Sequence, residues 1–406
     1  MPTSAPAIAP MLRAFLRALD EAGIRWTLLR PVASLAAEEG DVDVLVEPAS
    51  LAAVEAQAER LGYVLVPFAP PDVHAATYDD EAGRFVWLHV QGELRLAGEA
   101  FPAEDVLAEA VREGEAARPG DGWLLWILLL RALVDTGRLP ERHRDAVVEL
   151  ARRSSAAPEP LLARARALGI DPARAVALAA AADWDGLTAL AVHRPVPRRR
   201  RARRVARRLR SLRSRRGISV AVIGPDGAGK STLVEALARD LPLPVLVRYM
   251  GLTGRRMRRA EALRVPGLVF AARTGILWSR WLRALGHSVR GGIVVYERHT
   301  LDAYVPSGAA LGPAGRLSRR LQRRVVPLPD LVLLLDAPGR TLHERSGEYD
   351  ADVLERWRAA YAALERRVPH LVKLDAERPP DAVRRDAEKH VWRRYGELRG
   401  RRAGAR

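Results

Sequence analysis

The sequence predicts an α/β protein whose C-terminal part, residues 217–396, is a three-layer domain around a five-stranded parallel sheet. A small α/β domain and a helical segment precede it. Short runs of β-branched residues and leucine recur in 217–396 without polar alternation, which is typical of strands buried on both faces. These runs alternate with helical patterns, and such alternation favours a parallel sheet. The 406 residues, 48% of them apolar, are enough for two or three domains with separate cores.

Residues 1–100 are predicted to form the small α/β domain, because helical and extended patterns alternate along them. The expected helices cover residues 8–19 and 49–61, and the expected strands cover residues 25–29, 41–46, 63–68 and 84–96. Residues 101–193 are rich in alanine, leucine and arginine, and turn signals such as those at 137–140 divide them into short helices. We interpret residues 101–193 as a helical appendage.

A run of arginines follows this appendage. Residues 198–216 contain 12 arginines and no acidic residue, so they carry +12 of the net charge of +17. Because a Pro-Val-Pro segment precedes the run, we interpret residues 194–216 as an Arg-rich linker. A solvated linker helix and a segment that contacts anionic surfaces both fit this composition. Residues 397–406 are interpreted as a basic tail.

The remaining elements fall within residues 217–396. The expected strands cover residues 218–223, 244–250, 292–296, 331–335 and 371–374. The expected helices cover residues 230–241, a stretch that ends near residue 285, and residues 351–364 and 381–395. The first strand therefore leads directly toward the helix that begins at Lys230.

A glycine-rich loop joins that strand to that helix. Residues 224–231, Gly-Pro-Asp-Gly-Ala-Gly-Lys-Ser, match the P-loop (Walker A) pattern G-x-x-x-x-G-K-[ST]. In such a loop backbone N–H groups and the helix N-terminus face phosphate oxygens, the lysine reaches the β- and γ-phosphates, and the hydroxyl offers an oxygen to Mg²⁺. Lys230 is one of only three lysines among 66 basic residues. The residues expected to bind ATP are Gly224, Asp226, Gly227, Ala228, Gly229, Lys230, Ser231 and Thr232.

The loop and the segments after it resemble the thymidylate kinase branch of the P-loop nucleoside and nucleotide kinases. That family's loop reads G-x-D-G-x-G-K-[ST]-T, which Asp226, Gly227 and Thr232 fit. Further likenesses follow in the same order along residues 217–396. They are Gly286-His287; Glu297-Arg298-His299, with glutamate for the family's aspartate; Pro329-Asp330-Leu331 with Asp336; Arg345 to Glu348, at the place of the lid; and Leu374-Asp375-Ala376, similar to the segment that closes on adenine.

The resemblance implies an ATP-dependent phosphotransferase that uses Mg²⁺. Lys230, Arg298 and Arg345 are its catalytic candidates, because phosphoryl transfer depends on positioning and on neutralising charge. Ser231 and Glu297 are the candidate metal ligands, and Arg298 and Tyr304 are the candidate acceptor-binding residues. A surface ion pair is the alternative for Glu297-Arg298, and a solvated helix start is the alternative for Arg345.

One departure from the family leaves the acceptor open. Where the family carries Arg-Glu-Pro-Gly in its acceptor site, residues 248–254 read Arg-Tyr-Met-Gly-Leu-Thr-Gly. We expect a nucleoside monophosphate as acceptor. A kinase of a sugar or another metabolite, and an ATP-binding regulatory or assembly protein, are the alternatives. Trp278 and Trp281 are interpreted as packing against the sheet, with an acceptor pocket as the alternative.

The N-terminal part resembles, more weakly, a nucleotidyltransferase-fold domain. Asp41 and Asp43 match that fold's Asp-x-Asp strand, and strand alternation puts both carboxylates on one face, where they would bind metal. The third carboxylate that two-metal chemistry needs is missing, because Trp87, Leu88 and His89 occupy its strand. We therefore expect a degenerate, inactive domain. An active nucleotidyltransferase and a pair of solvated carboxylates are the alternatives.

Composition excludes several classes of site. The chain has no cysteine, so disulfides, thiolate zinc sites and cysteine nucleophiles are excluded, and a reducing compartment fits. The longest apolar stretch, residues 123–130, is far shorter than the ~20 residues that span a bilayer. We expect a cytoplasmic protein without a signal peptide or transmembrane segment. Its expected partner is a small-molecule acceptor, with a homodimer left open.

Overall fold

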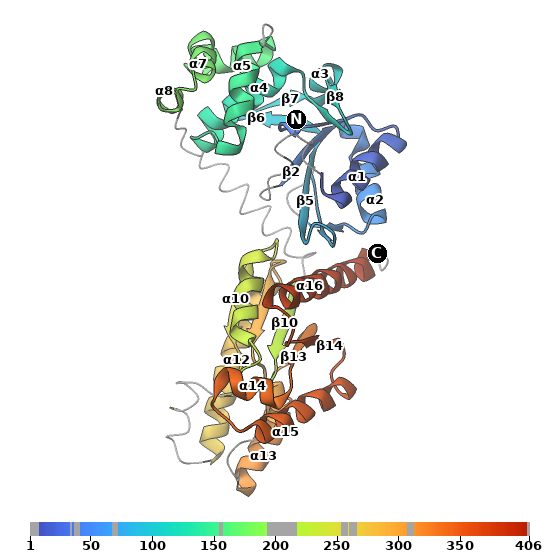
Figure 1. Cartoon of the computed structure of the whole chain (residues 1–406), viewed down its shortest axis with the longest axis vertical. Helices are drawn as coiled ribbons and strands as arrows, with labels where there is room; N and C mark the ends of the chain where they lie inside the picture. The colour runs from blue at the N-terminus through green and yellow to red at the C-terminus, as the bar shows by residue number, and fades with distance from the viewer. Residues whose placement is uncertain are drawn as a thin grey trace. The chain divides into compact units, whose positions relative to one another are not determined.

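The chain folds into two compact units, Met1–Arg207 and Arg208–Arg406 (Figure 1). The computed structural model describes residues 8–32, 35, 41–66, 72–153, 157–192, 217–252, 259, 266–306 and 312–403. The predicted Arg-rich linker, residues 194–216, lies outside these ranges. The units are therefore described one at a time.

A mixed sheet forms the first part of the N-terminal unit. Its order is β1-β2-β5-β4-β3; β2 and β5 are parallel, and the other neighbours are antiparallel. Its elements are β1 (Trp26–Leu28), β2 (Val42–Val46), β3 (Val64–Leu65), β4 (Val73–Asp79), β5 (Arg84–Gln91), α1 (Pro10–Glu21) and α2 (Leu51–Arg60). Phe15 and Leu16 of α1 and Val54 of α2 belong to the same core cluster as residues of these strands. Helices and strands thus alternate along residues 10–91, with β4 as a strand that was not predicted.

The second part of the N-terminal unit is mostly helical. Its helices are α3 (Ala103–Ala108), α4 (Asp121–Leu130), α5 (Arg144–Arg153), α6 (Glu159–Ala167), α7 (Pro172–Ala180) and α8 (Trp184–Ala189). Two hairpins that were not predicted accompany them: β6 (Glu93–Leu96) with β7 (Glu99–Pro102), and β8 (Val111–Glu113) with β9 (Ala116–Arg118). Leu94, Leu96 and Phe101 belong to the core of the helical part. The hairpin at residues 93–102 therefore packs with the appendage rather than with the sheet.

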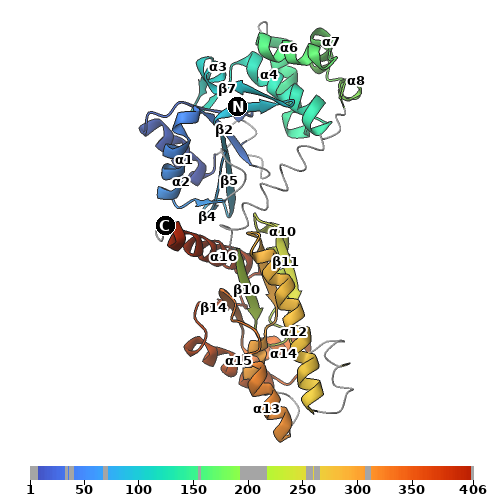
Figure 2. The same cartoon turned by 180° about the vertical axis from the view of Figure 1, so that it is seen from behind.

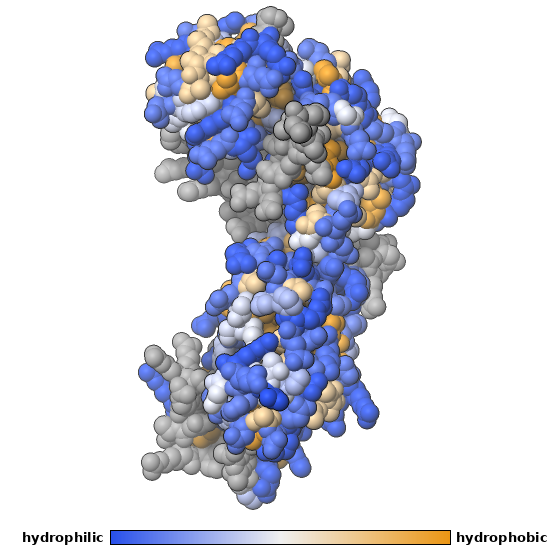
Figure 3. All heavy atoms as spheres, viewed as in Figure 1, coloured by the Kyte–Doolittle hydropathy of each residue, from blue (hydrophilic) through white to orange (hydrophobic). Residues whose placement is uncertain are grey.

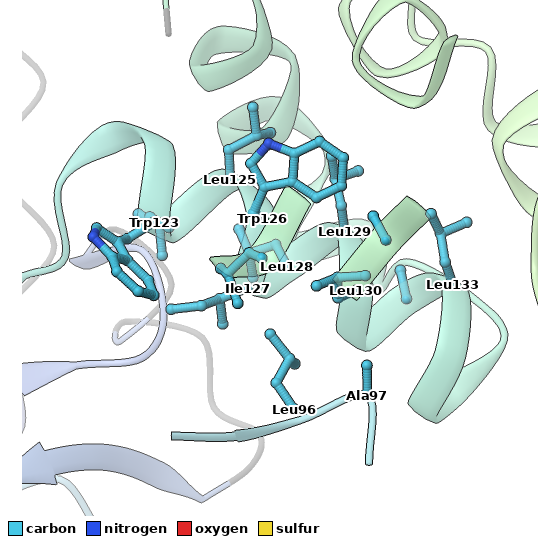
Figure 4. Packing of buried hydrophobic residues seen from close by; sticks show 14 of the residues in the cluster. Leu96, Ala97, Trp123, Leu125, Trp126, Ile127, Leu128, Leu129, Leu130 and Leu133 are labelled. Carbon is cyan, nitrogen blue, oxygen red and sulfur yellow. The ribbon is translucent and has the colours of Figure 1, made fainter. Parts of the chain in front are cut away.

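The apolar stretch at residues 123–130 is the centre of this second core. All its residues, Trp123 to Leu130, are buried in α4. Figure 4 labels all of them except Leu124, together with Leu96, Ala97 and Leu133 of the same core. A helix enclosed on all sides needs no polar face, which explains the continuous apolar run. Across the described ranges, no helix is long and apolar enough to cross a membrane.

The C-terminal unit contains the predicted five-stranded parallel sheet. Its order is β11-β12-β10-β13-β14, and every neighbouring pair is parallel. The strands are β10 (Ile218–Ile223), β11 (Val245–Tyr249), β12 (Ile293–Glu297), β13 (Leu331–Asp336) and β14 (Leu371–Asp375). β12, β10 and β13 are buried along almost their whole length, as strands covered on both faces require.

Helices cover both faces of this sheet. They are α10 (Lys230–Asp240), α12 (Pro266–Ser288), α13 (Pro313–Gln322), α14 (Gly339–Ser346), α15 (Ala351–Ala362) and α16 (Pro380–Ala403). Residues of α12 and α15 share a core cluster with Ala221, Val294 and Val332, whereas α10 and α16 pack against the sheet elsewhere. α10 lies in front in Figure 1, and α12 lies in front in the opposite view of Figure 2. α16 continues through most of the stretch interpreted as a basic tail.

The surface corrects one sequence interpretation. On the face shown in Figure 3, hydrophilic side chains cover most of each unit. Trp281 packs against the sheet core, as predicted. Trp278 does not: it is 45% exposed, because it lies on the outer side of α12, in edge contact with Trp281.

Candidate functional site

The loop from Gly224 to Gly229 lies at the carboxyl end of β10, between β12 and β13. Chain connections leave in opposite directions at this point of the sheet, which is where open parallel sheets bind ligands. Gly224 and Gly227 have φ angles of +145° and +84°. A Cβ on Gly224 would lie 2.6 Å from the Leu335 carbonyl oxygen, and one on Gly227 would lie 2.7 Å from that of Leu342. Both positions therefore require glycine.

Lys230 begins α10 directly after this loop. Its side chain is 7% exposed, and Nζ donates hydrogen bonds to the Pro225 carbonyl oxygen at 2.6 Å and to Asp226 Oδ1 at 3.3 Å. Burial lowers the pKa of Lys230, and the nearby charge of Arg298 lowers it further, against the effect of Asp226. The ammonium group is thus held inside the loop rather than extended into solvent.

The two predicted metal ligands come together. Glu297 ends β12 beside β10, and Ser231 Oγ donates to Glu297 Oε1 at 2.7 Å. Mg²⁺ prefers oxygen ligands and is often held by one carboxylate together with phosphate oxygens, so this pair fits a magnesium–nucleotide complex. Among the residues that the structure describes, no group of three or more His, Asp or Glu side chains is arranged to hold a metal by itself.

Arg298 extends the charged cluster from Lys230 toward the neighbouring strand. It follows β12 with a φ of +63°, in the left-handed region that non-glycine residues seldom adopt. Its guanidinium pairs with Asp226 and lies 3.7 Å from Asp302 Oδ2. Burial alone would raise the pKa of Asp226, but Lys230 and Arg298 outweigh this effect and lower it. Two cations thus surround one loop carboxylate.

The segment that departs from the family reaches this cluster. A Cβ on Gly251 would lie 2.6 Å from Tyr249 Oη and 3.0 Å from Arg298 Cδ. The Arg280 guanidinium of α12 lies 5.6 Å from the centre of the Tyr249 ring. Sequence reasoning missed Tyr249 and Arg280, because no motif marks them. Residues 253–254 of this segment lie outside the described residues.

Arg345 and Tyr304 lie at other contacts. On α14, Arg345 donates to the Ala376 carbonyl oxygen at 2.9 Å, which joins the two segments likened to the lid and to the adenine-closing stretch. The Tyr304 ring is covered by the guanidinium of Arg323 at 4.3 Å. Within the described part of the chain, neither side chain bonds to Lys230 or Arg298.

The carboxyl end of β13 carries a separate ion cluster. Asp336 accepts from Arg358 Nε at 2.8 Å and lies 2.9 Å from Lys373 Nζ. Burial opposes ionisation of this carboxylate, but the two cations outweigh it and lower the pKa of Asp336. Asp336 therefore ties α15 to β13 and β14.

In the N-terminal unit, the carboxylate of Asp43 is already bonded. It accepts from His89 Nδ1 at 2.8 Å and from Arg131 at 3.0 Å. Asp43 and His89 are direct neighbours in the parallel pair of β2 and β5, and Arg131 comes from a π-helical turn, Arg131–Thr136. Asp41 is exposed at the start of β2. His89 and Arg131 therefore already bind the carboxylate that the nucleotidyltransferase resemblance would assign to a metal.

Neither the models of known protein families nor the curated proteins gave a match to this chain. The geometry at the carboxyl edge of the C-terminal sheet therefore carries the functional argument.

Proposed function

We propose that the C-terminal unit is an ATP-dependent phosphotransferase, similar to thymidylate kinase, that transfers the γ-phosphoryl group of ATP to a small acceptor. A nucleoside monophosphate is the acceptor we propose first. The chain's lack of cysteine supports a cytoplasmic location. The proposal does not include the N-terminal unit, where Asp43 is bonded to His89 and Arg131.

One observation carries the proposal. Lys230, Arg298 and the Ser231–Glu297 pair meet around a loop whose glycines permit close backbone approach, at the start of a helix. A buried lysine and a half-buried arginine beside a helix N-terminus suit a polyanionic ligand, because the helix dipole and the side-chain charges attract the same negative groups. A surface ion pair would explain Glu297-Arg298 alone, but not the burial of Lys230.

The residues have distinct roles in this proposal. Lys230 stabilises the negative charge of the β- and γ-phosphates, and Arg298 binds the anionic group of the acceptor. Ser231 and Glu297 would hold Mg²⁺, which would neutralise charge on the phosphate oxygens. In the transfer, the bond from the γ-phosphorus to the bridging oxygen breaks, ADP leaves with the electron pair, and an acceptor oxygen forms the new bond. Arg345 remains the candidate to approach the phosphates from α14.

The test is a screen of acceptors. The protein is incubated with ATP, Mg²⁺ and a panel of nucleoside monophosphates, nucleosides, sugars and other metabolites, and ADP release is measured. We expect one acceptor class to raise ADP release, and Lys230→Ala to abolish the increase, because the phosphates lose their buried cation. Lys389→Ala, on α16, is the matched control and should behave as the wild type.

The outcomes separate the alternatives. Release dependent on a sugar or another metabolite would replace the nucleotide acceptor but keep the chemistry. ATP binding that depends on Lys230 without any acceptor-dependent release would favour a regulatory or assembly role. ATP binding that is unchanged in Lys230→Ala would contradict the proposal.

A further inference from the structure

Arg298 is held from two sides. Its backbone φ of +63° places it in the left-handed region, which is unfavourable for an L-residue, and such residues concentrate at functional sites. Its guanidinium pairs with Asp226 of the loop through one nitrogen and faces Asp302 through the other. Asp226 also contacts Lys230, so the first pairing brings two cations together. The second pairing, with Asp302, holds the other nitrogen of the guanidinium.

Asp302 needs partners of its own, because a carboxylate removed from water is costly unless it is paired and hydrogen-bonded. It accepts a hydrogen bond from Tyr361 Oη at 2.9 Å. Tyr361 lies on α15, is 3% exposed and belongs to the core cluster beneath the sheet. Arg319 donates to the backbone carbonyl oxygen of Asp302 at 3.0 Å, which fixes the turn that carries it. A chain of contacts thus runs from α15 to the loop.

We propose that Asp302 and Tyr361 are positioning residues that hold the Arg298 guanidinium beside Lys230, where the transferred phosphoryl group meets its acceptor. The inference rests on the proposed phosphotransferase function and adds two residues to it. Neither residue touches the ligand: Tyr361 orients Asp302, and Asp302 orients Arg298. Removing the Tyr361 hydroxyl should therefore weaken binding at the Arg298 end while leaving binding at Lys230 intact.

The probes are ATP and adenosine 5′-tetraphosphate, each with Mg²⁺, and the measurement is the Kd by calorimetry. The fourth phosphoryl group of the tetraphosphate extends past the γ-position, so it reports on Arg298 without a known acceptor. We expect the wild type to bind the tetraphosphate more tightly than ATP. Tyr361→Phe and Asp302→Asn should each reduce that preference about tenfold and leave the Kd for ATP unchanged, as loss of a charged hydrogen bond predicts.

A double-mutant cycle separates positioning from a general loss of structure. Tyr361→Phe should add no further loss in an Arg298→Gln background, because both changes act through one guanidinium. Tyr395→Phe is the matched control: this tyrosine of α16 is also buried, and its hydroxyl accepts from Arg399. Tyr395→Phe should keep the wild-type preference for the tetraphosphate over ATP.

Two different failures are distinguishable. The positioning inference is wrong, and the proposed function stands, if ATP binding requires Lys230 but the wild type does not prefer the tetraphosphate. The same holds if Tyr361→Phe keeps the tetraphosphate preference, or loses it independently of Arg298. If ATP binding does not require Lys230, both are wrong.

Discussion

His89 lies between two carboxylates on one face of the N-terminal sheet. Nδ1 is 2.8 Å from Asp43 Oδ1, and Nε2 is 3.7 Å from Asp72 Oδ2. Burial lowers the pKa of His89, but the hydrogen bonds to Asp43 and Asp72 outweigh burial and raise it to about 9. The neighbouring His74 ring stacks on it at 4.3 Å, and burial lowers the pKa of His74 to about 4. At neutral pH, His89 is therefore charged and His74 neutral.

This arrangement predicts a pH-dependent stability of the N-terminal unit. Because the folded pKa of His89 exceeds its ordinary 6.5, its stabilising effect is complete below pH 6.5 and is lost as the pH rises through about 9. Urea unfolding near pH 6 and near pH 10 should differ by on the order of 2–3 kcal/mol in free energy from this group. His89→Gln should remove most of that difference.

His74→Gln is the control for this prediction. His74 is neutral in the folded state but takes up a proton near pH 6 when the chain unfolds, which lowers stability at pH 6 only. Its removal should therefore keep the difference between the two pH values or increase it, in contrast to the removal of His89. A wild type with equal stability at both values would contradict the charged state of His89.

Single residues were predictable where a local pattern fixes them. The glycines, Lys230 and Ser231 follow from an eight-residue motif, because the conformation of a short loop depends on its own sequence. Tyr361 and Arg131 were missed, because each acts through a partner distant in the chain. Asp43 and Arg131, for example, are 88 positions apart. No sequence signal marks such pairs.

At the scale of elements, α12 carries an exposed apolar stripe. It consists of Leu268, Ala271, Gly275, Trp278, Leu282 and Leu285, which recur every three or four residues and are all exposed. Leu268 is 56% and Leu282 53% exposed. This spacing is that of a helix seam that packs against a second helix. The stripe has no charged residue, although the chain's net charge is +17.

We expect a second copy of the chain to cover this stripe. A contact without charged side chains adds no repulsion between two strongly positive copies. The small residues Ala271 and Gly275 beside Trp278 leave room for side chains of the second copy. Leu282→Glu should convert a dimer into a monomer in sedimentation measurements, because it places a carboxylate in the seam. Val111→Glu, at a residue 47% exposed on β8, should leave the dimer intact. A wild-type monomer would contradict the expectation.

Elements were predictable where burial leaves a strong pattern. The strands of the C-terminal sheet agree with the predicted ranges to within one or two residues. The pattern is strongest in β10, β12 and β13, because strands covered on both faces are continuous apolar runs. β4 was missed, because its sequence, Val-His-Ala-Ala-Thr-Tyr-Asp, mixes small and polar residues. β8 and β9 are three residues each and too short to show a period.

At the scale of the whole molecule, each unit has cores of its own. The clusters around α4 and around the first sheet contain only residues of the N-terminal unit, and the cluster beneath the parallel sheet contains only residues of the C-terminal unit. Self-contained cores are the property that allows domains to fold separately. The contact of residues 198–216 with anionic surfaces stays a prediction, because these residues lie outside the described ranges.

The C-terminal unit should therefore fold and bind ATP without the N-terminal unit. A fragment of residues 217–406 contains all five strands of the parallel sheet, the glycine-rich loop and Arg298. We expect it to unfold cooperatively in urea and to bind ATP with a Kd within about threefold of the full chain, because, among the described residues, the core beneath the sheet is built from the C-terminal unit. The same fragment with Lys230→Ala is the control and should fold but lose ATP. A folded fragment with much weaker binding than the full chain would show instead that the N-terminal unit completes the site.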